Sequence, residues 1–223
     1  MLYFYRIRRL LNSPVIHISE IYQQFIDGIR NTSTPELIAV ISGIASVWFS
    51  RKENILVYPV GLVGTIIYVF ITLEHHLPGE ASVNLYYTIM SIYGWYLWTL
   101  RNKRQEKIVQ ITFSDAAMWK KQLLFFAACY IIIFSCLVYL HRYFYASIPW
   151  ADAFASATAF TGMWLMTRKK VESWYWWIAT NIASVPLYFV KELMMSSVYY
   201  FILLLLAFWG LSTWKKKALV TPE

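Results

Sequence analysis

Charged residues are scarce in this chain, and their scarcity excludes an ordinary soluble fold. Only 14% of the 223 residues are Asp, Glu, Lys or Arg, while 59% are hydrophobic. Ordinary globular domains contain about 25% charged and about 45–50% apolar residues. A soluble fold of this size could not bury so much apolar surface, so the composition predicts a membrane protein.

Motifs for catalysis and energy coupling are also lacking. The sequence has no phosphate-binding Gly-rich loop, no nucleophile elbow and no zinc-protease motif. The apolar runs contain no acidic or basic relay that would serve proton coupling. Glu74, His75 and His76 are consecutive in a short loop without further ligands nearby, so we expect no metal and no cofactor. These absences favour a passive membrane protein over an enzyme or an ATP-driven pump.

Cysteine is equally rare, because Cys129 and Cys136 are the only two. They lie seven positions apart in one apolar run, which places their Cα atoms about 10 Å apart on a helix. That distance is too long for a disulfide, so we expect both to be packing residues.

The basic residues are distributed as a membrane protein requires. The formal net charge is +8, but every Lys and Arg falls outside the centres of the apolar runs, which argues against nucleic-acid binding. Most of the 20 Lys and Arg residues follow the first, third, fifth and last apolar segments. The positive-inside rule therefore predicts a cytoplasmic carboxyl terminus and an amino terminus outside.

Seven apolar segments are long enough, or nearly so, to cross a bilayer, which needs about 20 residues. They cover approximately 35–50, 55–73, 81–100, 121–140, 149–167, 173–191 and 196–214. Thr34, with Pro35 and Glu36 after it, is predicted to cap the first helix. Residues 15–29, within an amino-terminal segment 1–34, have the pattern of an amphipathic helix on the membrane surface or against the bundle. A solvent-exposed helix with one packed stripe is the alternative.

Two of the seven segments end alike. Gly94 and Trp98 close the third segment in an aromatic-Gly-x-x-x-Trp pattern, and Gly210 and Trp214 close the seventh, each followed by a basic cluster. This predicts an all-α membrane protein in which the domain 35–217 contains two related units, 35–100 and 149–214, before a tail at 218–223. The single linker helix between them, 121–140, gives both units the same orientation, so they are parallel repeats in a 3+1+3 arrangement.

Polar and aromatic residues recur on one face of several predicted helices, where they are expected to line a site between the two units. The candidates for substrate binding are Tyr68, Asn84, Tyr87, Thr88, Ser91, Asp152, Trp177, Asn181, Ser184 and Tyr188. Such a set of indole, phenol and carboxamide groups suits a flat, polar and possibly cationic heterocycle.

Other interpretations of these residues stay open. Asn, Ser and Thr side chains also join helices by hydrogen bonds, as in a non-transporting sensor or assembly protein. A membrane enzyme acting on a lipid-like substrate is a further alternative. Asp152 either stabilises the start of its helix or attracts a cationic ligand at the mouth of the site.

The segment 168–181, with Trp177 and Asn181 in a Trp-x-x-x-Asn element, resembles the PnuC family of vitamin transporters. The Tyr-Gly-Trp-Tyr-x-Trp element at 93–98 is similar to the same family, and Asn84 stands where members carry Gln or Asn. The resemblance covers roughly residues 36–217. It implies a SWEET-like fold, a homotrimer in the bacterial cytoplasmic (inner) membrane, and substrate contacts from Trp177, Asn181 and Asn84.

The resemblance also implies uptake of an unphosphorylated vitamin by facilitated diffusion, made one-way by phosphorylation in the cytoplasm. Nicotinamide riboside, an NAD precursor, is the expected substrate, with thiamine or riboflavin as alternatives. Two features depart from the family pattern: Asn84 is one methylene shorter than Gln, and Gly162-Met163 replaces an Ala-Gln pair of some members. Both departures bear on substrate identity.

Overall fold

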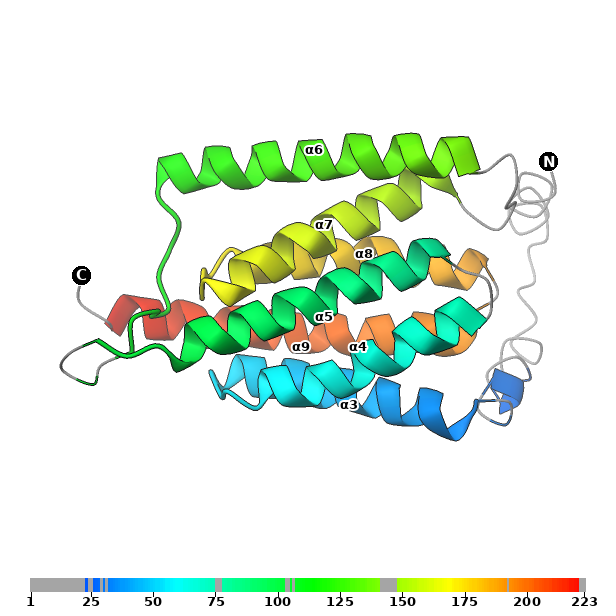
Figure 1. Cartoon of the computed structure of the whole chain (residues 1–223), viewed down its shortest axis with the longest axis horizontal. Helices are drawn as coiled ribbons and strands as arrows, with labels where there is room; N and C mark the ends of the chain where they lie inside the picture. Colours follow the sequence, from blue (N-terminus) through cyan, green and yellow to red (C-terminus); the bar gives the residue numbers. More distant parts are fainter. Residues whose placement is uncertain are drawn as a thin grey trace.

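The computed structural model consists of seven long helices within the part of the chain that it describes. The described residues are 23, 26–28, 30, 32–74, 78–102, 105, 107–140, 148–191 and 193–220. The helices are α3 (Thr34–Arg51), α4 (Val57–Glu74), α5 (Pro78–Thr99), α6 (Ala116–Leu140), α7 (Pro149–Thr167), α8 (Ser173–Val190) and α9 (Met194–Val220) (Figure 1). The predicted all-α class is thus confirmed. Most of the predicted amphipathic segment 15–29, together with His75 and His76, lies outside the described residues.

Every predicted apolar segment coincides with one of these helices. Three of them, α4, α6 and α9, are long and apolar enough to cross a membrane by length and composition alone. Eight of the ten residues that the sequence analysis selected for substrate binding lie on two of the other helices, α5 and α8. Helices α6 and α9 are longer than predicted, because α6 begins at Ala116 and α9 continues through the basic cluster to Val220.

Helix boundaries follow from local capping. The side chain of Ser33 caps α3 by accepting a hydrogen bond from the Glu36 N–H, so the prediction that Thr34 is the cap was wrong by one residue. Asp115 starts α6 earlier than hydropathy predicts, since its carboxylate accepts the Met118 N–H at 2.7 Å. A polar cap one turn before the apolar run is invisible to a hydropathy window.

The seven helices form two groups of three with α6 beside them. We call α3–α5 the first unit and α7–α9 the second unit. Neighbouring helices pack together within each unit, while α3 contacts α9 and α5 contacts α7 between the units. Figure 1 shows that α3, α5, α7 and α9 run in one direction and that all four finish at the end of the bundle where the carboxyl terminus lies. Because Lys and Arg residues gather there, we call this the basic end.

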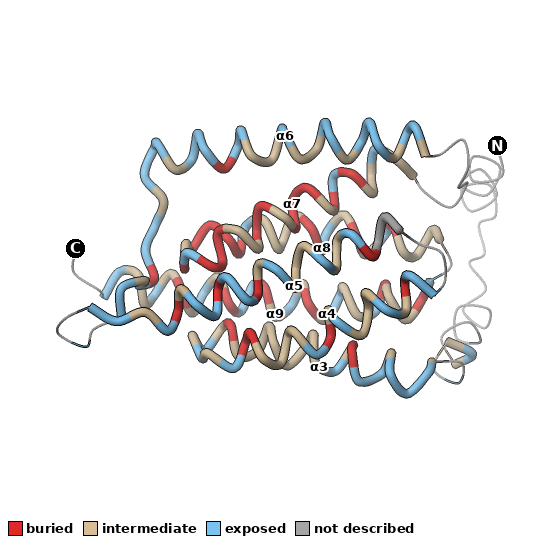
Figure 2. Tube along the Cα trace, viewed as in Figure 1, coloured by how far each residue is buried: buried red, intermediate tan, exposed pale blue. Residues whose placement is uncertain are grey.

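Helix α6 stands apart and packs against α7. Most of its surface is exposed or only half-buried (Figure 2), and Gln122 is its one buried residue. The Gln122 side-chain oxygen accepts the Trp176 indole N–H of α8 at 2.8 Å. This hydrogen bond ties α6 to the second unit, and the apolar remainder of α6 is left to face lipid or another protein.

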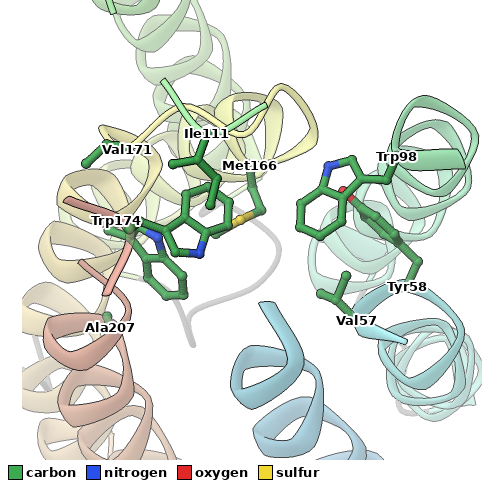
Figure 3. Packing of buried hydrophobic residues seen from close by; sticks show 9 residues of the cluster. Val57, Tyr58, Trp98, Ile111, Met166, Val171, Trp174 and Ala207 are labelled. Carbon is green, nitrogen blue, oxygen red and sulfur yellow. The ribbon is translucent and has the colours of Figure 1, made fainter. Parts of the chain in front are cut away.

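The main hydrophobic cluster lies at the basic end, where both units contribute to it. Figure 3 shows Tyr58 and Trp98 of the first unit facing Met166 of the second unit, with Trp174 behind it. The buried members are Val57, Tyr58, Trp98, Ile111, Met166, Val171, Trp174, Ala207 and Trp214. The core therefore joins the two units rather than filling each one separately.

The two similar sequence endings build the same local structure. A Cβ atom added to Gly94 would lie 2.5 Å from the Tyr58 ring. A Cβ atom added to Gly210 would lie 2.4 Å from the Trp174 ring. Each glycine therefore admits an aromatic ring against the helix backbone. That ring then meets the terminal tryptophan of its own unit edge-on, with Tyr58 and Trp98 centroids 5.1 Å apart. The corresponding separation is 5.5 Å in the second unit.

The terminal tryptophans, Trp98 and Trp214, also form hydrogen bonds between the units. The Trp98 indole N–H of α5 donates to the Thr167 carbonyl at the end of α7, at 3.1 Å. The Trp214 indole N–H of α9 donates to the Ser50 carbonyl near the end of α3, also at 3.1 Å. Carbonyls in the last turn of a helix have no partner within that helix. Trp98 thus supplies a donor for the Thr167 carbonyl, whereas Trp214 adds a second donor to the Ser50 carbonyl, which also accepts the Glu53 N–H at 2.9 Å.

Replacing Gly210 with Ala is expected to destabilise the protein by about 1–3 kcal/mol, because the new methyl group would overlap the buried Trp174 ring. The thermal unfolding midpoint in detergent measures this loss. Gly61→Ala is the matched control, since its methyl group would meet only the movable Ser46 hydroxyl at 2.8 Å. Equal midpoints for the two variants would contradict the proposed packing role of Gly210.

Candidate functional site: aromatic and amide groups between the two units

Asn181 is one of five described residues with a buried side-chain polar atom that has no hydrogen-bond partner; the others are Arg51, Tyr58, Gln122 and Trp174. Asn181 lies in the middle of α8, and its side chain is 2% exposed. Its amide oxygen is buried and has no hydrogen-bond partner in the structure. Buried polar atoms are nearly always paired, because an unpaired one costs roughly 1–3 kcal/mol. Asn181 therefore presents an acceptor that is available to a donor from outside the protein.

Trp177 lies one turn before Asn181 and brings an aromatic ring to the same region. Its indole packs against Gly162 of α7, where a Cβ atom would lie 3.3 Å from the ring. The Tyr87 ring of α5 is 6.1 Å from the Trp177 ring, measured between centroids. An aromatic side chain of the first unit thus meets the aromatic and amide groups of the second, as the sequence pattern predicted for Tyr87 and Trp177.

Two further aromatic residues at this junction were not found by the sequence analysis. Tyr86 stacks on Phe160 of α7 with ring centroids 4.1 Å apart, and its hydroxyl donates to the Phe160 carbonyl at 2.9 Å. Tyr87 approaches the same Phe160 ring at 6.2 Å. The Tyr86-Tyr87 pair was the available signal, but one helical face was selected and Tyr86 lies off it.

A second group of tyrosines connects α8 and α9. Tyr188 stacks on Tyr200 with centroids 5.0 Å apart, and Tyr199 meets Tyr200 edge-on at 5.4 Å. The Tyr199 hydroxyl lies against Gly43 of α3, where there is no room for a Cβ atom. Tyr68 and Tyr87, both predicted from the first unit, lie near these tyrosines. The predicted phenols therefore do gather, with Tyr199 and Tyr200 as members that the sequence analysis missed.

Several predicted hydroxyl groups are engaged in helix packing. The Thr88 hydroxyl bonds to the Thr65 hydroxyl of α4 at 3.0 Å and to the Asn84 carbonyl at 2.9 Å. Ser91 and Ser184 are buried, and the side chain of Asn84 is half-buried. In the second unit, the Thr180 and Thr158 hydroxyls form an unpredicted equivalent pair at 2.9 Å. For Thr88 in particular, the structure displays the helix-joining role that the sequence left as an alternative.

Asp152 belongs to the opposite end of the bundle from the basic end. Its carboxylate pairs with the Lys191 ammonium at 2.6 Å and accepts the Ile148 N–H at 2.6 Å. It thereby stabilises the start of α7 and joins it to the end of α8. This arrangement favours the helix-start interpretation of Asp152, while the side chain remains 18% exposed.

The basic end contains a charged cluster that the sequence analysis did not select. The Glu53 carboxylate contacts Lys169 at 2.7 Å, Lys217 at 3.2 Å and Lys107 at 3.4 Å. Burial raises the pKa of Glu53, but hydrogen bonds and charges from these lysines outweigh burial, so its pKa lies below the ordinary value. Burial lowers the pKa of Lys169, and Glu53 opposes that shift only in part. Glu53 is thus held as a carboxylate between three cations.

The fold and the site together define a class of protein: a multi-pass helical membrane protein with aromatic and amide side chains gathered between two units. The family model described as "Nicotinamide mononucleotide transporter" matches residues 33–216. The chain belongs to this family, and the resemblance to the PnuC vitamin transporters noted in the sequence is confirmed.

Individual relatives are distant but nearly full-length. The nicotinamide riboside transporter PnuC of Escherichia coli K12 is 24% identical over 210 residues, covering 82% of this chain and 85% of the relative. The riboflavin/roseoflavin transporter RibM of Streptomyces davaonensis is 24% identical over 181 residues, covering 80% and 83%. A crystal structure of the vitamin B3 transporter PnuC has the same fold, with a TM-score of 0.65, 21% identity, and coverage of 98% and 97%. These relatives are transporters, not enzymes.

Replacing Asn181 with Leu is expected to leave the thermal midpoint of the ligand-free protein unchanged or higher. Leu has a similar volume, and the substitution removes the cost of a buried, unpaired amide oxygen. Thr180→Val, which removes a hydroxyl that is paired with Thr158, is the contrasting variant and should lower the midpoint. A clear loss of stability in Asn181→Leu would mean that the Asn181 side chain holds helices together and is not an unpaired acceptor for a ligand.

Proposed function

We propose that this protein takes up nicotinamide riboside across the bacterial cytoplasmic membrane by facilitated diffusion. The observation that carries this proposal is the unpartnered amide oxygen of Asn181, buried one turn from the Trp177 ring. A nicotinamide carboxamide or a ribose hydroxyl supplies the donor that this oxygen lacks. The aromatic rings of Tyr87 and Trp177 supply faces that attract a flat, cationic ring.

The chemistry of the site favours the riboside over its phosphorylated form. The residues gathered around Asn181 are phenols, indoles, hydroxyls and amides, all of them uncharged at neutral pH. A phosphate group would bring a charge of about −1.5 to −2 into the interior of the bundle. Burying that charge without a cationic partner is strongly unfavourable, so the mononucleotide is expected to bind much less tightly.

All seven helices are proposed to span the membrane, as two parallel repeats joined by α6 in a SWEET-like 3+1+3 arrangement. The domain then covers residues 35–217, with the amino-terminal segment 1–34 at the membrane surface outside and residues 218–223 as a cytoplasmic tail. The common direction of α3, α5, α7 and α9 supports the repeat. The concentration of Lys and Arg supports a cytoplasmic location for the basic end.

The remaining site residues are assigned by their position near this centre. Trp177, Asn181 and Tyr87 are proposed to touch the substrate, with Asn84 opposite and Tyr188 beside them. Tyr68, Ser91 and Ser184 line or support the path, Thr88 supports Asn84, and Asp152 acts at the mouth. The exposed apolar face of α6 is the surface available for assembly into a homotrimer.

Uptake of labelled nicotinamide riboside into proteoliposomes is expected to saturate and to need no added energy source. Asn181→Leu should reduce uptake by at least about tenfold, the equivalent of one hydrogen bond worth roughly 1.4 kcal/mol. Ile182→Ala is the matched control, because Ile182 is the next residue and faces outward at 55% exposure. It should transport at the parental rate.

Competition by unlabelled compounds against labelled nicotinamide riboside identifies the substrate in the same uptake assay. Unlabelled nicotinamide riboside should inhibit, and nicotinamide mononucleotide should not. Stronger inhibition by thiamine or riboflavin would assign the protein to those vitamins instead. Absence of saturable uptake for all of them, in protein that also shows no thermal shift with any, would favour the non-transporting alternative.

A further inference from the structure

Glu53 and Lys169 occupy matching positions in the two units and contact each other directly. Each follows the residue that caps the first helix of its unit, and their φ angles, 58° and 51°, are both left-handed. Glycine is the usual residue at such a position, because other residues are strained there by roughly 1 kcal/mol or more. The chain instead keeps a carboxylate at one position and an ammonium at the other, 2.7 Å apart.

Other residue pairs with the same spacing in sequence also meet at this junction. Glu53 and Lys169 are 116 positions apart, and so are Ser50 and Met166, whose side chains contact at 3.0 Å. Trp98 and Trp214 have the same spacing, and their ring centroids are 6.2 Å apart. Corresponding residues that touch one another mark the line about which the two units are related. Three such pairs lie at the basic end.

These pairs form consecutive layers across the end of the bundle. Lys169 is 1% exposed and lies 4.6 Å over the ring of Trp98, which in turn bonds to the carbonyl of Thr167. The ion pair therefore lies next to the Trp98 ring, which pairs with Trp214. Charge thus forms one layer of the junction and indole the next.

The ion pair has alternative partners at its rim. Lys107 and Lys217 also contact Glu53, but their side chains are 47% and 41% exposed. Glu53, Lys107 and Lys217 border a hollow of about 570 Å³ that Lys216 and Gln110 help to line. When the Glu53 carboxylate moves away from Lys169, Lys107 and Lys217 can therefore still balance its negative charge. Separating the units then costs less than breaking an isolated buried pair.

We propose that the Glu53–Lys169 ion pair is the latch that closes the basic end of the path between the two units, and that it parts when this end opens. Because it joins the units at their common line, the pair must lengthen in any movement that separates α3 from α7 at this end. By contrast, the ion pair at the opposite end, between Asp152 and Lys191, lies within the second unit. The proposal rests on the proposed transport function only in assuming that the protein has an open state.

Accessibility of Met166 tests the latch without any substrate. Met166 is 5% exposed and contacts Ser50 of the first unit directly beneath the ion pair. In a protein carrying Cys129→Ala, Cys136→Ala and Met166→Cys, a membrane-impermeant maleimide applied to the basic end should label slowly. Adding Glu53→Gln should accelerate labelling about tenfold, because the open state gains population when the pair is lost.

Two further variants separate the latch from a general loss of structure. The exchange E53K/K169E is made together with Lys107→Gln and Lys217→Gln, because a lysine at position 53 would otherwise face two like charges. It restores the pair with its charges reversed and should return labelling to within about twofold of a parent that carries the same two glutamines. Lys169→Met removes the buried cation while leaving Glu53 with its rim lysines, so it folds even if Glu53→Gln does not, and it should label as fast. Lys107→Gln removes only an exposed partner and should change the rate by less than about twofold.

The outcomes distinguish the latch from the proposed function. Slow labelling in Lys169→Met, or fast labelling in the folded exchange variant, would overturn the latch whatever the protein transports. The expected labelling pattern combined with no uptake of nicotinamide riboside would leave the latch standing and reject the substrate.

Discussion

Two reciprocal hydrogen bonds hold the units of this protein together: each terminal tryptophan donates its indole N–H to a helix-end carbonyl of the other unit. The first bond pairs the Thr167 carbonyl, and the second adds a donor to the Ser50 carbonyl, which also accepts the Glu53 N–H. Together they tie the ends of α3 and α7 to α9 and α5. Gly94 and Gly210 permit these bonds by letting Tyr58 and Trp174 pack against the helix backbone. The layers above and below the tryptophans depend on this placement. The charged cluster closes the basic end, and the aromatic site lies further into the bundle.

The candidate site and the basic end differ in the charge of their side chains. Around Asn181 the side chains are neutral, and one acceptor is left unpaired, which suits a ligand that carries its own donor and no net negative charge. At the basic end, Glu53 and the lysines around it carry opposite charges, which offsets part of the cost of burying them. A transported solute has to pass both regions. In the proposed function, the junction built from separable ion pairs opens, and the packed interior around Asn181 selects the solute.

Particular residues show which features of the packing and of the candidate site could be predicted from sequence patterns. The aromatic-Gly-x-x-x-Trp repeat predicted two related endings, and the structure gave both the same packing. Helical spacing correctly placed Trp177 with Asn181 and brought Tyr87 to them. It could not distinguish Thr88, which bonds to Thr65, from Asn181, whose amide oxygen has no partner among the described residues. Both are polar residues on an apolar helix, and only the neighbouring helices decide which of them is satisfied. Tyr86, Phe160, Tyr199 and Tyr200 were missed because the aromatic content of the chain is high throughout.

The sequence by itself determined the membrane class, the seven helices, and the resemblance that led to the family, because hydropathy, helical period and short motifs are local properties of the chain. Only the tertiary structure decided that Glu53 contacts Lys169 and that the Trp98 and Trp214 indoles each bond to a carbonyl of the other unit. It also decided that the Asn181 amide oxygen has no partner among the described residues. These facts depend on pairing residues that are far apart in the sequence. No local pattern records such a pairing, since it is set by how two separately formed units pack against each other.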